Sequence, residues 1–290
     1  MLWVIYGILH SMLRSACAET GRIFQFDGWR MGFWQALCGL VLLLPFLPFM
    51  VWPVDGAFYL AAAGVSVIFT VGALVQAKLS AERRGRVFAI YVPIETIAAM
   101  VIWALVMPHM LEEYLHDSLM TVSMAMAFMF ASFSLLRIRD NDLSWRTFLY
   151  VAPMGLSYAV AAVVTKIVLM EYGMDLYGTA LTYVLVIFAV MTVVMGVSLL
   201  AKRKASGTEI TTPRLIQGGA IAGLFSAMSY GTFVVSVALA PNPGYVSMMA
   251  MLLPVWLLSW HGFLRLEDKA SPLAALFIVI SILLMIVAAA

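Results

Sequence analysis

The sequence predicts an all-α polytopic membrane protein with ten transmembrane helices in two inverted five-helix repeats, from its composition, its apolar segments and the placement of its basic residues. Of the 290 residues, 64% are hydrophobic and 11% are charged, whereas soluble domains carry roughly 25% charged residues. A soluble fold of this size could not bury so much apolar surface. The net charge of +2 without a basic tail argues against nucleic-acid binding, and the apolar content argues against disorder.

A helix needs about 20 apolar residues to cross a hydrocarbon core of about 30 Å. Ten stretches meet this requirement, separated by the Pro, Gly and charged residues that are typical of loops. They are 2–19, 31–52, 57–78, 87–108, 118–136, 147–169, 177–200, 215–239, 245–263 and 273–290. No basic region precedes the first stretch, so a cleaved signal peptide is not expected. Because the helices use nearly the whole chain, any function must lie within the membrane.

The basic residues predict how these helices are oriented. The loops after helices 1, 3, 5, 7 and 9 hold fifteen of the 17 Lys and Arg residues: Arg22, Arg30, Lys78, Arg83, Arg84, Arg86, Arg137, Arg139, Arg146, Lys202, Arg203, Lys204, Arg214, Arg265 and Lys269. The loops after helices 2, 4, 6 and 8 hold no Lys or Arg but six acids: Asp55, Glu112, Glu113, Asp117, Glu171 and Asp175. By the positive-inside rule, the first set of loops is cytoplasmic and both termini face outward from the cell (inner, cytoplasmic) membrane.

A repeated spacing predicts that the chain is built from two halves. Ala77 stands sixteen residues before Pro93, and Ala238 stands sixteen before Pro254. Both prolines are expected inside the fourth helix of their half, and an acidic loop and a final apolar helix follow each. The repeats are then 1–141 and 142–290, within one integral membrane unit. Because five is odd, the second repeat must cross the membrane in the opposite sense, which is typical of secondary transporters with a binding site near the midplane.

Two segments resemble a known family. The first runs from Gly244 through Leu253-Pro254-Val255-Trp256 to Leu264-Arg265-Leu266-Glu267-Asp268-Lys269 and a closing helix. It is similar to the second-repeat signature of EamA-type members of the drug/metabolite transporter (DMT) superfamily. The second segment, Gly155-Leu156-Ser157-Tyr158-Ala159 followed by Lys166, is similar to the opening of the family's sixth helix, with Tyr158 in place of the usual Trp.

This resemblance implies ten helices, a central cavity lined by helices 1 to 4 and 6 to 9, and transport of small polar or amphipathic metabolites. The chain departs from the family pattern in two respects. The first repeat lacks a Gly-Glu turn after its fourth helix. The charge count places both termini outside, whereas many relatives are drawn with both inside. Inverted repeats can insert either way according to loop charge, so we follow the charge count.

Charged groups within spans cost about 2.5 to 3.5 kcal/mol each on insertion scales, so each one is a functional hypothesis. Glu95 is the leading candidate, because it lies within about 3 Å of the midplane and is too short to reach either interface. Burial favours the neutral form of a carboxylate, so Glu95 could alternate between a proton and a cationic group of the substrate. The structural alternative is that it only pairs with Arg14 or Lys166.

Four further residues are candidates for substrate binding or coupling. His10, also near the midplane, is either a relay partner of Glu95 or a neutral histidine bonded inside the bundle. Arg14 and Lys166 could each hold a substrate carboxylate, while a structural pairing is the alternative for Arg14 and snorkelling to water near Glu171 is favoured for Lys166. Tyr158 stands mid-helix at the family's motif position. Small residues at Gly218, Gly219, Ala220 and Gly223 predict close helix packing.

The function that follows is secondary transport by alternating access, with protons as a possible coupling ion. One acid and two bases around a midplane cavity favour an amino acid or a related amine or zwitterion as the substrate. A lipid-carrier flippase and a non-transporting scaffold or partner subunit are the alternatives. No nucleotide-binding or catalytic motif is present, so we expect neither an enzyme nor a cofactor nor a metal site. The expected state is a monomer or homodimer, and Cys17 and Cys38 are read as packing residues.

Overall fold

A computed structural model describes residues 1–25, 27–83, 91–109, 112, 116, 118–137, 145–173, 175–206, 211–265 and 271–289 of the chain. Within these residues the regular structure is helical throughout, and helices occupy all ten predicted stretches. The elements are α1 (Leu2–Phe24), α2 (Gly28–Leu43), η1 (Leu44–Phe49), α3 (Gly56–Arg83), α4 (Tyr91–Val106), α6 (Ser118–Arg137), α7 (Trp145–Tyr172), α8 (Leu176–Ser206), α9 (Pro213–Leu239), α10 (Pro243–Met249), η3 (Ala250–Leu252), α11 (Leu253–Phe263) and α12 (Pro272–Ala288).

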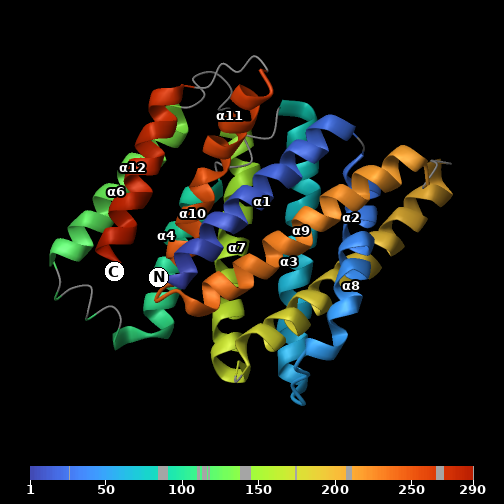
Figure 1. The fold of residues 1–290 in the computed structure, drawn as a ribbon, viewed down its shortest axis with the longest axis horizontal. Helices are drawn as coiled ribbons and strands as arrows, with labels where there is room; N and C mark the ends of the chain where they lie inside the picture. The colour runs from blue at the N-terminus through green and yellow to red at the C-terminus, as the bar shows by residue number, and fades with distance from the viewer. Residues whose placement is uncertain are drawn as a thin grey trace.

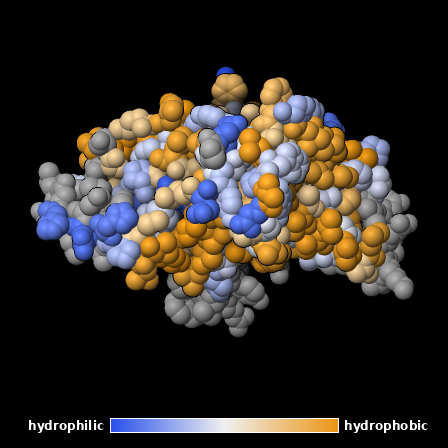
Figure 2. All heavy atoms as spheres, turned by 90° about the horizontal axis from the view of Figure 1, so that it is seen from below, coloured by the Kyte–Doolittle hydropathy of each residue, from blue (hydrophilic) through white to orange (hydrophobic). Residues whose placement is uncertain are grey.

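The chain is an α-helical membrane protein by the length and apolar character of its helices. Six helical stretches among the described residues are long and apolar enough to cross a bilayer: Gly28–Phe49, Gly56–Val75, Ala152–Tyr172, Leu176–Ala201, Pro213–Leu239 and Pro243–Phe263. Three shorter apolar helices accompany them: Tyr91–Val106, Thr121–Ser134 and Pro272–Val287. Hydrophobic side chains cover much of the face seen in Figure 2, as expected for a surface in contact with lipid.

α1 is more polar than the other long helices, yet it is continuous over 23 residues. It packs along α9 (Figure 1), and small residues make the approach close. A Cβ on Gly218 would lie 2.8 Å from the Phe24 ring of α1, and one on Gly219 would lie 2.3 Å from the Trp34 Cβ of α2. Gly223 approaches the α2 backbone in the same way, 2.8 Å from the Gln35 carbonyl oxygen. The predicted packing role of these glycines is confirmed, whereas Ala220 is exposed.

The two prolines expected inside helices lie in helical backbone. Pro254 stands within the helical stretch Pro243–Phe263, in which the 3-10 turn η3 joins α10 to α11. Proline lacks the N–H that would bond to the carbonyl four residues earlier, and that residue is Ala250, where η3 begins. The expectation of a mid-helix proline is therefore confirmed for Pro254. Pro93 is the third described residue of α4, and the residues directly before Tyr91 lie outside the described part of the chain.

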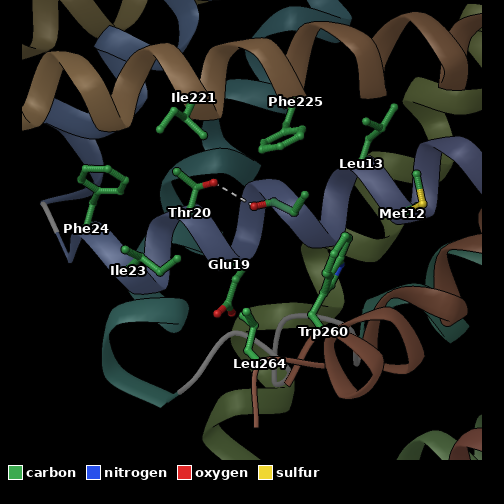
Figure 3. Close-up of a pocket in the computed structure, with 11 residues that line it drawn as sticks. Met12, Leu13, Glu19, Thr20, Ile23, Phe24, Ile221, Phe225, Trp260 and Leu264 are labelled. Carbon is green, nitrogen blue, oxygen red and sulfur yellow. Dashed lines mark hydrogen bonds between the residues drawn. The ribbon is translucent and has the colours of Figure 1, made fainter. Parts of the chain in front are cut away.

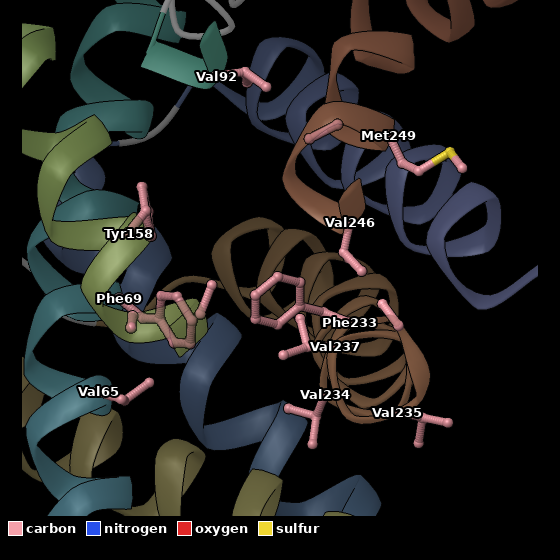
Figure 4. Packing of buried hydrophobic residues seen from close by; sticks show 14 of the residues in the cluster. Val65, Phe69, Val92, Tyr158, Phe233, Val234, Val235, Val237, Val246 and Met249 are labelled. Atoms are coloured by element: carbon pink, nitrogen blue, oxygen red, sulfur yellow. The ribbon is translucent and has the colours of Figure 1, made fainter. Parts of the chain in front are cut away.

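Aromatic side chains fill the core between α3, α7 and α9. The Phe69 ring lies 5.5 Å from Tyr158 and 6.1 Å from Phe233, measured between centroids, and Figure 4 shows these residues meeting with the valines of α9. α4 closes one side of this core through its contacts with α7 and α10. Helices from both predicted repeats therefore meet at the centre of the molecule.

Charged side chains gather at the two ends of the bundle. Arg22, Arg30, Arg214 and Arg265 share one end, because Phe24 packs on Gly218, Trp34 packs on Gly219, and Ile23 and Leu264 line one groove. At the other end the Tyr172 hydroxyl donates a hydrogen bond to Asp55, and Asp175 caps the start of α8 through the Gly178 N–H. The structure does not describe the other basic loop side chains or the side chain of Ala77. The predicted acids Glu113 and Asp117 and the predicted repeat boundary at 141 and 142 also lie outside the described residues.

Candidate functional site

Glu95 lies on the buried face of α4, with 4% of its surface exposed. The Ser247 hydroxyl of α10 donates a 2.9 Å hydrogen bond to Glu95 Oε1. Glu95 Oε2 is also buried and has no hydrogen-bond partner among the described residues. A buried carboxylate oxygen that lacks a donor is costly, so it is a position at which a ligand or a proton would be stabilised.

The short helix α10 brings Ser247 to this carboxylate. The Asn242 side chain accepts a 2.8 Å hydrogen bond from the Gly244 N–H and so caps the first turn of α10. A Cβ on Gly244 would lie 2.4 Å from Met100 Cγ and 3.1 Å from the Thr96 carbonyl oxygen of α4. Only glycine lets the α10 backbone come this near to α4, and the approach places Ser247 one helical turn further on, beside Glu95.

Arg14 of α1 reaches the same region and lies between aromatic rings. Its Cζ is 5.5 Å from the Tyr91 centroid and 5.4 Å from the Tyr158 centroid, within the range of cation–π attraction. The guanidinium also hydrogen-bonds to the Tyr158 side chain and is close enough to Glu95 for attraction between the two charges. The Tyr158 hydroxyl fits here because Gly72 of α3 has no Cβ, which would lie 1.8 Å from it.

We call Arg14, Tyr91, Glu95, Tyr158 and Ser247 the polar cluster. They come from α1, α4, α7 and α10, and so from both predicted repeats. The cluster combines a fixed cation, an acid with one open oxygen and several hydroxyls in a buried region. Such an arrangement can exchange a proton at the acid, or hold a small ligand that carries both an ammonium and a carboxylate group.

His10 is brought into a different set of contacts. Its Nδ1 donates a 2.9 Å hydrogen bond to the Ser229 carbonyl oxygen of α9 and lies 2.9 Å from the Ser229 hydroxyl. The His10 ring also packs 5.0 Å from Phe233. No hydrogen bond between His10 and Glu95 occurs in the described part of the chain. This geometry favours the alternative of a histidine bonded inside the bundle over a direct relay to Glu95.

Lys166 is not directed to water near Glu171, contrary to the favoured expectation. It is 5% exposed, and Nζ donates hydrogen bonds to the carbonyl oxygens of Ala240 at 2.6 Å, Ala238 at 3.1 Å and Val237 at 3.4 Å. These carbonyls end α9 and carry the negative pole of its dipole. The same ammonium lies 5.4 Å from the Trp103 centroid. Lys166 therefore caps a helix and lies outside the polar cluster.

Sequence reasoning did not single out Ser247 or Trp103 as site residues. Ser247 stands within the segment that resembles the family signature, but a serine in an apolar helix gives no signal of its partner. Trp103 is 2% exposed, and its Nε1 has no hydrogen-bond partner among the described residues. Its spacing from Glu95, two helical turns along the buried face of α4, is the signal that could have found it.

A separate groove runs between α1, α9 and α11 (Figure 3), with a volume of about 360 Å³. It is lined by Met12, Leu13, Ala16, Glu19, Thr20, Ile23, Phe24, Ile221, Phe225, Trp260 and Leu264. At about 100° per residue, the α1 side chains of the groove centre about 150° around the helix from Arg14. The groove and the polar cluster are therefore on different sides of α1.

Among the described residues, no three His, Cys, Asp or Glu side chains gather as a metal site would require, and Cys17 and Cys38 are free thiols. The chain matches no protein-family model and no curated protein sequence.

Proposed function

We propose that the protein is a secondary transporter that moves a small polar or amphipathic metabolite across the membrane by alternating access. The observation that carries this proposal is a buried Glu95 oxygen that has no hydrogen-bond partner among the described residues, within a cluster contributed by both halves of the chain. A buried acid beside a fixed cation is expensive in a membrane protein unless it serves a ligand or a proton. The resemblance to EamA-type members of the DMT superfamily supports the same proposal.

The proposed architecture is ten spans in two inverted five-helix repeats. Helices α1 and α9 run antiparallel and α2 and α9 run parallel, as the contacts of Phe24 with Gly218 and of Trp34 with Gly219 require. Both directions agree with ten successive crossings. The gathering of Arg22, Arg214 and Arg265 at one end supports placing that end in the cytoplasm, with both termini outside. α1 is included as a span because its 23 residues extend about 34 Å.

The proposed substrate is an amino acid or a related amine. Its ammonium group would bind Glu95 Oε2, to which no described residue donates a hydrogen bond. Its carboxylate would bind Arg14, which the rings of Tyr91 and Tyr158 hold in place. When no substrate is bound, a proton on Glu95 would lower the cost of burying its charge. Substrate and proton would then compete for one carboxylate, which gives proton coupling a physical basis.

The test is uptake of amino acids and amines into vesicles that contain purified protein. Glu95→Gln should lower uptake at least about 100-fold, because leaving a buried charge without its ionic partner costs about 3 to 5 kcal/mol. Glu171→Gln, at an exposed position, is the matched control and should transport normally. A ligand thermal-shift panel on both variants locates the defect in binding. Full uptake with unchanged pH dependence in Glu95→Gln would exclude this role for Glu95.

A flippase for a lipid carrier would need an apolar groove that continues into the polar cluster. The groove beside α1 is apolar, but α1 stands between it and Arg14, which favours the small polar substrate. Vesicle measurements separate these alternatives, because a scaffold or partner subunit gives no flux and a flippase moves labelled lipid between leaflets.

A further inference from the structure

The groove between α1, α9 and α11 has the dimensions of one lipid acyl chain. It extends along α1 from Met12 to Phe24, which is about 18 Å at the rise of an α-helix. Half of a hydrocarbon core is about 15 Å. With the predicted span 2–19 centred in the bilayer, Met12 lies about 2 Å from the midplane and Phe24 lies at headgroup depth. The groove thus covers a single leaflet.

The rim of the groove is apolar and open. Ile23, Leu264 and Ile221, from α1, the end of α11 and α9, are all exposed although they line the groove. Figure 3 shows Ile221 and Phe225 directed from α9 toward α1, with Trp260 on the opposite side. Within the hydrocarbon core, exposed aliphatic side chains contact lipid and not water, whereas Ile23, by the same helical rise, lies at headgroup depth. The groove is therefore filled from the side, by something that is already in the membrane.

The headgroup end of the groove carries positive charge. Arg22 adjoins the lining residue Ile23, and Arg265, with φ 54°, adjoins Leu264. The one acid in the lining, Glu19, is already compensated, because Arg22 Nε donates 2.9 Å hydrogen bonds to its carboxylate and His261 Nε2 lies 3.3 Å from Glu19 Oε2. Among the described residues at this end, the charges of Glu19, Arg22 and Arg265 leave a net charge of +1, which complements a lipid that has a negative headgroup.

We propose that this groove binds one anionic phospholipid of the leaflet at the arginine-rich end. One acyl chain lies against Leu13, Ala16 and Phe225, and the phosphate lies between Arg22 and Arg265. The lipid fills the space between α1 of the first predicted repeat and α9 and α11 of the second. It strengthens the contact between them beside the hydrogen bond from Trp260 Nε1 to the Ser15 hydroxyl. This site is distinct from the polar cluster and does not depend on what is transported.

The test is a thermal-shift titration of delipidated, full-length protein in detergent with phosphatidylglycerol and with phosphatidylcholine of the same acyl chains. Phosphatidylglycerol should raise the melting temperature with saturation near one lipid per chain. Because Glu19 compensates Arg22, one net positive charge at the headgroup should make it bind roughly fivefold more tightly than phosphatidylcholine. Equal effects of the two lipids, or no saturation, would overturn the proposal.

Variants locate the lipid. Ala16→Trp fills the groove and should abolish the saturable shift, whereas Leu105→Trp, at an exposed apolar position away from the groove, should keep it. Arg22→Gln combined with Arg265→Gln should bring phosphatidylglycerol down to the affinity of phosphatidylcholine. Because Ala16→Trp could disturb packing, its melting temperature without lipid is compared with that of the parent. Retention of the shift in a folded Ala16→Trp protein would place the lipid elsewhere. None of these readings uses transport, so the proposed function is tested separately.

Discussion

Arg14 and Lys166 are both cations within predicted spans, but they are stabilised in different ways. Arg14 faces the rings of Tyr91 and Tyr158 and the charge of Glu95, all of which are side chains. Lys166 faces three backbone carbonyls at the end of α9 and the ring of Trp103. A planar guanidinium suits stacking, whereas a compact ammonium suits a ring of carbonyls. The difference indicates that side chains of the polar cluster hold Arg14, whereas Lys166 joins α7 to the end of α9.

The largest expected effect on stability comes from Lys166→Met. The substitution leaves the carbonyls of Val237, Ala238 and Ala240 without their buried donor, and each orphaned acceptor costs about 1 to 3 kcal/mol. Because some of these carbonyls can find water, we expect a total loss of roughly 2 to 4 kcal/mol. The measurement is unfolding of the purified protein in a denaturing-detergent titration. Unchanged stability would mean that Lys166 is not a structural cap.

Exchanging the two cations sharpens the comparison. Arg14→Lys keeps the charge but loses the planar contact with two rings, each worth about 0.5 to 2 kcal/mol, so we expect uptake to fall about tenfold with little change in stability. Lys166→Arg should do the opposite, because a guanidinium does not fit the space that holds an ammonium. Uptake kinetics and the same unfolding titration are measured on both variants. If both lose stability and neither loses uptake, the division between site and cap is wrong.

The helices could be predicted because each one needs a continuous apolar stretch, and such a stretch is visible in consecutive residues of the sequence. The same pattern does not reveal where a helix is interrupted. Residues 245–263 are mostly apolar, and the 3-10 turn η3 begins at Ala250, four residues before Pro254. A proline predicts a local disturbance of the helix, but the sequence does not show whether that disturbance is a kink, a 3-10 turn or the end of the helix.

The sequence allowed the buried charged residues of the site to be predicted, but not the partners that they contact. Glu95 was identified from the cost of its charge at midplane depth, and the structure places it in a buried region near Arg14. Depth alone could not assign Lys166 to the end of α9, because that requires knowing which helix end lies beside it. His10 likewise bonds to Ser229, which is 219 residues away in the sequence, and no local pattern indicates this partner.

Tyr158→Phe tests the side-chain character of the cluster with a smaller change. It removes the hydroxyl that bonds to Arg14 but keeps the ring beneath the guanidinium. A hydrogen bond to a charged group contributes about 1.5 kcal/mol, so uptake should fall roughly tenfold or less. Thr165 bonds to the Tyr183 hydroxyl outside the cluster, which makes Tyr183→Phe the matched control. An equal loss of uptake in both variants would indicate a general packing defect.

The smallest effect is expected outside the membrane, where a charge is stabilised in contact with water. The Tyr172 hydroxyl and the Ala57 N–H donate hydrogen bonds to Asp55, and they lower the pKa of its carboxyl below the ordinary value. A lowered folded pKa gives stability that is complete above the unfolded pKa, about 3.9, and is lost as the pH falls through the folded pKa. Tyr172→Phe should therefore melt slightly lower than the parent near pH 6, and the difference should shrink as the pH falls below the unfolded pKa. Because Asp55 is exposed, water compensates most of the lost bond, and a difference comparable to that of Lys166→Met would contradict this contrast between exposed and buried charges.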